Sequence, residues 1–259
     1  MIEQDVLFEV REGIGWLTFN RPDARNAMTF EMYGRLAEIA KDTTRDRSVR
    51  ALVLTGAGSA FVAGTDIGQF RSFTEERDPI EYEERMDAVL GAVEEVRVPT
   101  IAAIGGVATG GGLAIAAACY LRLASPNATF GVPIARTLGN CLSMVNLVRL
   151  ASLIGSARVK ELIFTARLVD AAEARAIGLV HEVAADEAAL LPRAEELARR
   201  LATHAPRTLW ATKEGLRRMR LRLLPEEGRD LVLSCYLSRD FREGVAAFMA
   251  KRKPEWTGE

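Results

Sequence analysis

The chain has 259 residues, of which 49% are hydrophobic, and its 34 Lys and Arg residues nearly balance its 35 Asp and Glu residues. A chain of this length and composition can bury a substantial core, which excludes a disordered protein. The balanced charge gives no reason to expect nucleic acid or an anionic membrane as a partner, so a small, specific ligand is the better expectation.

The cysteines and the amino terminus indicate the cellular compartment of the protein. Three cysteines, Cys119, Cys141 and Cys235, lack the spacing of metal ligands, which predicts reduced thiols and no metal site. The first five residues carry two acids and no apolar signal segment, and no apolar run approaches the length of a membrane span. We therefore expect a cytoplasmic protein.

The first part of the chain predicts a hairpin followed by a helix. Residues 6–10 and 14–19 read as two strands around Glu12-Gly13, because β-branched and aromatic residues alternate there with others. Thr29 is the expected N-cap of the helix. The apolar positions of that helix fall on one stripe, namely Met32, Leu36, Ile39 and Ala40.

The strand-then-helix unit recurs along the next part of the chain. Residues 51–55 precede a helix at 80–96, and residues 100–104 precede a helix at 113–120. Short strands follow at 121–124 and 129–130. Such units predict an α/β protein with stacked, largely parallel strands and helices outside.

After Gly155 the pattern becomes helical. Gly178, Pro206 and Pro225 separate the expected helices, and Asp170 is the expected N-cap of the helix at 171–177. The basic stretch 217–222 is expected to be a solvated face, with contact to an anionic ligand as the alternative. The expected helices cover residues 157–164, 171–177, 187–204, 207–222, 226–236 and 240–250.

A glycine-rich turn, Thr109-Gly110-Gly111-Gly112, lies between the apolar run 101–104 and a helix of small residues at 113–119. The first N–H groups of a helix lack intrahelical partners, and glycine lets a ligand approach them, so the turn indicates an anion or oxyanion site. A tight strand-to-helix turn without a ligand is the alternative. The spacing fits neither a P-loop nor a dinucleotide fingerprint.

A second loop, residues 61–67, follows the strand-like run 49–55. Two loops of this kind can supply two converging N–H donors. A pair of fixed donors stabilises the negative charge of an enolate or a tetrahedral intermediate.

These motifs occur in an order that resembles the crotonase (enoyl-CoA hydratase/isomerase) superfamily over nearly the whole chain. The resemblance implies a ββα spiral core at residues 1–195 and a C-terminal helical trimerisation region at 196–259, in a homotrimer or a dimer of trimers. The matching segments are Asn20-Arg21-Pro22 with Asn26-Ala27-Met28, 61–67, 99–112, Phe130-Gly131-Val132-Pro133, 164–167 with 174–180, and 240–244 through Lys251-Arg252.

The resemblance also implies roles for particular residues. The backbone N–H groups of Thr65 and Gly111 would be the two oxyanion donors. The substrate would be an acyl-CoA thioester, so that CoA enters as part of the substrate and no cofactor is tightly bound. Contacts with CoA are expected from Arg25, Ala63, Ile67 and Lys251.

One departure from the family pattern argues against ordinary hydration with two glutamates. Hydratases of the family carry two glutamates, but this chain has Ala114 and Ile134 at the matching positions. Adding water across a double bond needs a base and an acid, which positioned carboxylates usually provide. The candidates to replace them are Asp66, Asn140 and Cys141, with loop organisation as the alternative for Asp66 and an inert thiol as the alternative for Cys141.

The sequence thus predicts an acyl-CoA lyase or isomerase that stabilises a thioester enolate without the usual two glutamates. A narrower version is loss of a carboxylate by decarboxylation. The alternative from a different class is a catalytically silent acyl-CoA-binding or scaffold subunit.

Overall fold

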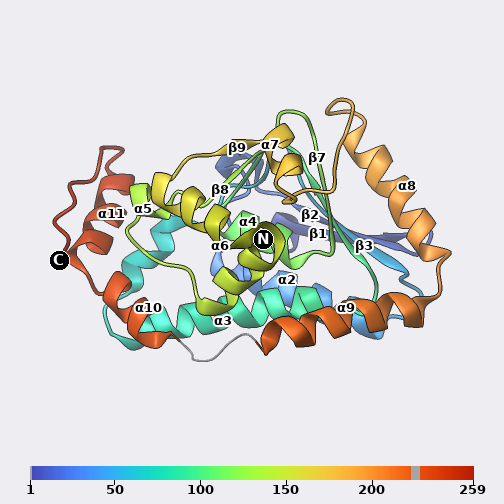
Figure 1. Ribbon diagram of the computed structural model, residues 1–259, viewed down its shortest axis with the longest axis horizontal. Coiled ribbons are helices and arrows are strands. Elements are labelled where there is room, and N and C mark those ends of the chain that lie inside the picture. The colour runs from blue at the N-terminus through green and yellow to red at the C-terminus, as the bar shows by residue number, and fades with distance from the viewer. Residues whose placement is uncertain (1, 223–227) are drawn as a thin grey trace.

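Two β-sheets surrounded by helices make up the fold of the computed structural model, which describes residues 2–222 and 228–259 (Figure 1). In this part of the chain the larger sheet has the strand order β1-β2-β3-β5-β7-β10, and its neighbouring strands are parallel except β1 and β2. Its strands are β1 (Val6–Arg11), β2 (Ile14–Phe19), β3 (Ala51–Gly56), β5 (Thr100–Ile104), β7 (Leu121–Ala124) and β10 (Glu182–Val183).

The smaller sheet has the strand order β4-β6-β8-β9, and only β9 is antiparallel to its neighbour within the described residues. Strands β4, β6 and β9 were not predicted. Each has only two or three residues, and β4 and β6 overlap the loop expected at 61–67 and the turn expected at 109–112. The strands are β4 (Ala60–Val62), β6 (Val107–Thr109), β8 (Thr129–Gly131) and β9 (Val169–Asp170).

The helices include every one expected from the sequence. Helix α10 begins at Arg229, and the residues expected to begin it, together with Pro225, lie outside the described residues. The helices are α1 (Ile2–Asp5), α2 (Phe30–Arg45), α3 (Arg77–Glu95), α4 (Gly111–Ala118), α5 (Ile134–Thr137), α6 (Met144–Thr165), α7 (Ala171–Ala176), α8 (Leu190–Ala202), α9 (Pro206–Leu221), α10 (Arg229–Tyr236) and α11 (Arg239–Met249), with 3₁₀ turns η1 (Pro22–Ala24) and η2 (Ile67–Ser72).

The hairpin turn, the helix N-cap and the apolar helix stripe predicted for the start of the chain are confirmed. Glu12 and Gly13 both have positive φ, 48° and 77°, which is the backbone of a tight two-residue hairpin turn. The Thr29 hydroxyl accepts a hydrogen bond from the Met32 N–H at 3.2 Å and so caps α2. The apolar stripe of α2 is buried.

Both faces of the larger sheet are covered, which explains why its strands are apolar almost throughout. One face, with Leu17, Leu52 and Ala102, joins the main core beneath α2, α3 and α4. The other face, with Trp16 and Val53, packs against α8. In Figure 1, α8 lies at the right of the view, and α2, α3 and α9 run along its lower edge.

The chain winds through three successive units of two strands and a helix, β3-β4-α3, β5-β6-α4 and β7-β8-α6. Each unit gives its first strand to the larger sheet and its second to the smaller one. The predicted ββα spiral, followed by a helical C-terminal region, is therefore confirmed. The division at residues 195 and 196 falls inside α8 and stays a prediction.

Two features of the helical region differ from expectation. Helix α6 begins at Met144, well before Gly155, and Gly155 breaks it with a φ of 76°. The basic stretch 217–222 is not wholly a solvated face, because Arg220 is buried and pairs with Glu94. Burial of an arginine depends on a partner carboxylate that is distant in sequence, so the local pattern does not reveal it.

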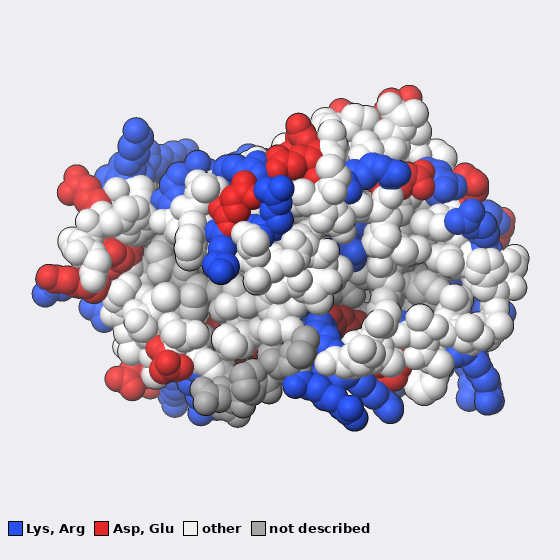
Figure 2. Space-filling model, in the orientation of Figure 1, with Lys and Arg blue, Asp and Glu red and all other residues white. Residues whose placement is uncertain are grey.

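Acids and bases are interspersed over the face in Figure 2, with lysines and arginines gathered along the lower edge, where α9 runs in Figure 1. This distribution agrees with the formal net charge of −1. Of the helices that the structure describes, none is long and apolar enough to cross a membrane.

Candidate active site

A cavity of about 430 Å³ lies where the loops after β4 and β6 meet α3 and the segment at residues 133–142. Thr65 follows β4 and Gly111 follows β6, and these two strands are parallel neighbours. The carboxyl ends of parallel neighbours meet at one edge of a sheet, so the two loops converge although the chain separates them. Both residues line the cavity.

The glycine-rich turn is built so that the backbone can reach this cavity. Gly110 has φ 52° and ψ −118°, a conformation that side chains disfavour. A Cβ on Gly112 would lie 2.0 Å from the carbonyl oxygen of Val62, so only glycine lets α4 pack against β4. These two positions explain why the turn must be glycine even without a ligand.

The backbone N–H groups of Thr65 and Gly111 have no acceptor among the described residues. Met28 bonds to the residues on either side of Thr65, since its N–H donates to Gly64 and its carbonyl accepts from Asp66, both at 2.8 Å. Gly111 is the first residue of α4, where no intrahelical acceptor exists. The cavity therefore has two unpaired backbone donors on its wall.

A row of hydroxyl groups lies beside the two donors. Thr65 Oγ1 is 2.9 Å from the Tyr33 hydroxyl and 3.0 Å from the Tyr82 hydroxyl, and all three residues line the cavity. Burial raises the pKa of Tyr33 to about 12, so its hydroxyl stays neutral. Any side chain at Gly111 would place its Cβ 2.1 Å from the Tyr33 oxygen. The tyrosines were not predicted, since isolated tyrosines in helices usually pack in the core.

Asp66 lines the cavity, but its carboxylate is already engaged. One oxygen pairs with the Arg21 guanidinium at 2.7 Å, and the other accepts from the Gly68 N–H at 3.1 Å to cap η2. These bonds fix the loop that carries Thr65, so the contacts favour loop organisation over proton transfer.

Asn140 and Cys141 also line the cavity. The Asn140 side-chain amide donates to the Tyr236 hydroxyl at 3.0 Å. A hydrogen bond with Cys235, together with burial, raises the pKa of Cys141. A nucleophilic cysteine needs a stabilised thiolate, so this environment favours the inert thiol.

Glu83 of α3 is a further cavity residue that was not predicted from the sequence. It lines the cavity, it is 8% exposed, and it accepts a hydrogen bond from the Tyr236 hydroxyl at 2.6 Å. Burial raises its pKa to about 7. A sequence clue existed, because Glu83 interrupts the apolar stripe of Pro79, Met86 and Leu90 on α3.

The residues expected to contact CoA divide into two groups. Arg25, Ala63 and Ile67 line the cavity. Lys251 is exposed just beyond α11 and is absent from the described lining, to which α11 contributes Phe248. Ala114 and Ile134 both line the cavity, so the positions where the family resemblance implies glutamates are apolar wall.

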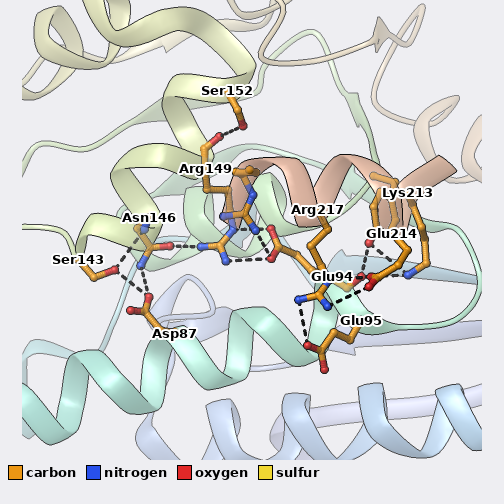
Figure 3. A network of polar contacts seen from close by, with 12 residues as sticks. Asp87, Glu94, Glu95, Ser143, Asn146, Arg149, Ser152, Lys213, Glu214 and Arg217 are labelled. Carbon is orange, nitrogen blue, oxygen red and sulfur yellow. Dashed lines mark hydrogen bonds and ion pairs between the residues drawn. The ribbon is translucent and has the colours of Figure 1, made fainter. Parts of the chain in front are cut away.

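Behind the cavity wall, polar side chains join α3, α6 and α9 (Figure 3). Asn146 lines the cavity and donates to Asp87 at 3.3 Å. Deeper in the protein, Arg149 and Arg220 both pair with Glu94. The network holds α3, and with it Tyr82 and Glu83, against α6.

The repeated ββα units, with a cavity beside the glycine-rich turn, define a crotonase-type α/β protein. The family model described as enoyl-CoA hydratase/isomerase matches residues 9–259, and the chain belongs to this family. It is 37% identical over 264 residues to a "Probable enoyl-CoA hydratase" of Rhizobium meliloti, an alignment that covers 99% of each chain.

Two solved structures are similar over nearly the full length. An enoyl-CoA hydratase/carnithine racemase from Magnetospirillum magneticum has a TM-score of 0.80 at 33% identity, covering 98% of this chain and 96% of that one. Methylmalonyl-CoA decarboxylase in complex with 2-nitronate-propionyl-CoA has a TM-score of 0.90 at 25% identity, covering 99% of each chain.

Proposed function

We propose that the protein is an acyl-CoA-processing enzyme that stabilises a thioester enolate between the backbone N–H groups of Thr65 and Gly111, without the two glutamates usual in hydratases. The observation that carries the proposal is the pair of unpaired backbone donors on one cavity. Donors fixed before the reaction stabilise the charge that develops on the thioester oxygen in the transition state.

The binding of CoA follows from the same geometry. The oxyanion loop brings Ala63 and Ile67 to the cavity beside Thr65, and Arg25 supplies a cation there. Because CoA carries phosphates on a long arm, a cation at the cavity and backbone groups along the loop at 61–67 suit it. CoA enters as part of the substrate.

The apolar character of Ala114 and Ile134 favours isomerisation or decarboxylation over two-glutamate hydration. Loss of a carboxylate leaves an enolate directly and needs no base to form it. The likeness to a structure named methylmalonyl-CoA decarboxylase supports keeping this reaction among those tested.

The first experiment incubates the protein with enoyl-, 3-hydroxyacyl- and malonyl-type CoA thioesters and follows hydration, double-bond shift and loss of CO₂ by absorbance and mass. We expect turnover of one class. The same two apolar positions also favour a silent acyl-CoA-binding subunit, and tight binding of acyl-CoA without turnover of any thioester would establish that alternative.

A pair of variants tests the Gly111 donor. Gly111→Pro deletes the N–H, but any side chain there also meets the Tyr33 hydroxyl. Both Gly111→Pro and Gly111→Ala are therefore made in a Tyr33→Phe background. We expect the proline variant to be about a hundred- to a thousandfold slower than the alanine variant. Equal rates would refute the donor assignment.

A further inference from the structure

Glu83 and Asp66 are the two carboxylates that line the cavity in the described part of the chain. They differ in what surrounds them. Asp66 is tied to Arg21 and to the Gly68 N–H, whereas Glu83 forms no ion pair with a described Lys or Arg. A carboxyl group without a cation in a buried wall is costly to keep for packing alone, which indicates a chemical role.

The Glu83 carboxyl is held in place by a short chain of hydrogen bonds. The Asn140 amide donates to the Tyr236 oxygen at 3.0 Å, and the Tyr236 hydroxyl donates to Glu83 Oε1 at 2.6 Å. Asn140 also lines the cavity, and Tyr236 packs in the aromatic cluster with Phe70 and Phe241. The Tyr236 hydroxyl, itself held by Asn140 and by aromatic packing, thus fixes one oxygen of the Glu83 carboxyl group.

The surroundings of Glu83 set its protonation near neutral pH. Burial is the main cause of the raised pKa of about 7, the negative charge of Asp87 adds to it, and the bonds from Tyr236 and the Ser143 N–H oppose it. The other titratable groups that face Glu83 are Tyr33, Tyr82, Cys141 and Tyr236, whose pKa values are all raised, so they remain neutral. At neutral pH the carboxyl group can therefore both accept and return a proton.

We infer that Glu83 is the acid–base residue of this cavity, moving a proton to and from the carbon beside the thioester carbonyl, with Tyr236 and Asn140 as its positioning residues. This inference rests on the proposed function, because it needs an enolate held at Thr65 and Gly111. It assigns the proton transfer to α3, and not to the positions of Ala114 and Ile134.

The step balances without a further reactant. Ionised Glu83 takes the proton from C2 of an acyl-CoA, the C2–H bond breaks, and its electron pair forms the C1–C2 double bond while the thioester oxygen becomes negative. Return of the proton to C2 restores the substrate. In a 3-enoyl thioester, return to C4 instead moves the double bond to C2–C3, and Glu83 is ionised again.

The test measures exchange of the C2 protons of butyryl-CoA in D₂O by mass spectrometry. It compares the wild type with Glu83→Gln and with Glu81→Gln, a matched control on the exposed side of the same helix. We expect Glu83→Gln to lower the exchange rate at least about a hundredfold. Glu81→Gln should match the wild type, and calorimetry should give the same Kd for butyryl-CoA in all three proteins.

The positioning residues are tested by the pH profile. Exchange by the wild type should rise through a midpoint near 7 and then level off. Tyr236→Phe removes a hydrogen bond to the ionised form, so the midpoint should move to higher pH, which a merely structural effect would not produce. Glu83→Asp keeps the carboxyl group and should retain part of the exchange rate. If Glu83→Gln does not fold, Glu83→Asp is measured in its place.

The outcomes separate this inference from the proposed function. Wild-type exchange in Glu83→Gln, together with the loss expected for the Gly111→Pro variant, would overturn the role of Glu83 and leave the enolate chemistry standing. A wild type that binds butyryl-CoA but neither exchanges its protons nor turns over any thioester would overturn both. An unshifted midpoint in Tyr236→Phe would remove the positioning role.

Discussion

At the scale of single residues, the residues around the cavity have two kinds of role: some fix the conformation of the loops, and others can take part in a reaction. Gly110 and Gly112 are required by backbone conformation and by the close approach of β4. Asp66 fixes a loop through its bonds to Arg21 and Gly68. The buried Glu83 carboxyl group bonds to one other side chain, the Tyr236 hydroxyl, and forms no ion pair with a described Lys or Arg, so it can exchange a proton with a ligand.

Replacing Asp66 by Asn tests its assignment to loop organisation. Asn keeps an acceptor for the Gly68 N–H but loses the ion pair with Arg21, which is about one-third exposed and so weak. We expect a loss of about 1 kcal/mol or less, a fall in Tm of about 2–4 °C and a fall in kcat below tenfold. A thousandfold fall in kcat at unchanged Tm would instead make Asp66 the acid–base group.

Because burial raises the pKa of Glu83, we expect the free energy of unfolding to depend on pH. Its pKa is raised from 4.5 to about 7 on folding, so its stabilising contribution is complete below pH 4.5 and is lost as the pH rises through 7. Relative to Glu83→Gln, the wild type should lose on the order of 3 kcal/mol between pH 4.5 and pH 8. Urea unfolding at several pH values measures this difference, and parallel curves for the two proteins would contradict it.

At the scale of elements, α3 is the helix on which the cavity depends. It carries Tyr82 and Glu83 to the cavity and ends at the buried network of Figure 3. Arg149 from α6 and Arg220 from α9 both bond to Glu94 of α3. Lys213 of α9 donates to the backbone carbonyl of Glu94 as well, so α9 holds the carboxyl end of α3 in place.

Replacing Arg149 by Met tests that network. It removes one of the two guanidinium groups that pair with the buried Glu94 carboxylate, which keeps Arg220. We expect a loss of about 3 kcal/mol in the free energy of unfolding. The matched control is Arg158→Met on the same helix, whose ion pair with Glu161 is exposed and should contribute less than about 1 kcal/mol. Equal effects of the two changes would refute a special role for the buried pair.

At the scale of the whole molecule, the C-terminal helices expose large apolar side chains. Leu216 and Met219 of α9 are 62% and 67% exposed, and Phe248 of α11 is 52% exposed. Leu216 and Met219 lie three residues apart on α9, and exposed apolar side chains that gather in this way mark a surface that another protein covers. The expected homotrimer, or dimer of trimers, offers such a cover in a second copy of this chain.

We therefore predict a mass of three or six chains of 28.3 kDa by light scattering after size exclusion. Met219→Glu should shift the protein toward smaller species, because it places a charge within the expected contact. Lys160→Glu, an exposed change on α6, is the control and should leave the mass unchanged. A monomeric wild type at micromolar concentration would contradict the prediction.

Local patterns determined much of this molecule. The hairpin around Glu12-Gly13, the cap at Thr29 and the strand-then-helix units depend on neighbouring residues, so the sequence predicts them directly. The two loops that carry Thr65 and Gly111 were also predictable, because glycine marks positions where backbone must be exposed. Strands β4 and β6 were not, because each is short and overlaps a segment whose glycines indicated a loop.

Only the tertiary structure decided which side chains meet at the cavity. Glu83, Tyr236 and Asn140 lie far apart in the chain. They come together because α10 packs on α3 and Asn140 bonds to Tyr236 of α10. The paired burial of Arg220 and Glu94 arises in the same way. A side chain's burial, partners and pKa depend on contacts that are distant in sequence, whereas helix caps, turns and periodicity depend on residues only a few positions apart.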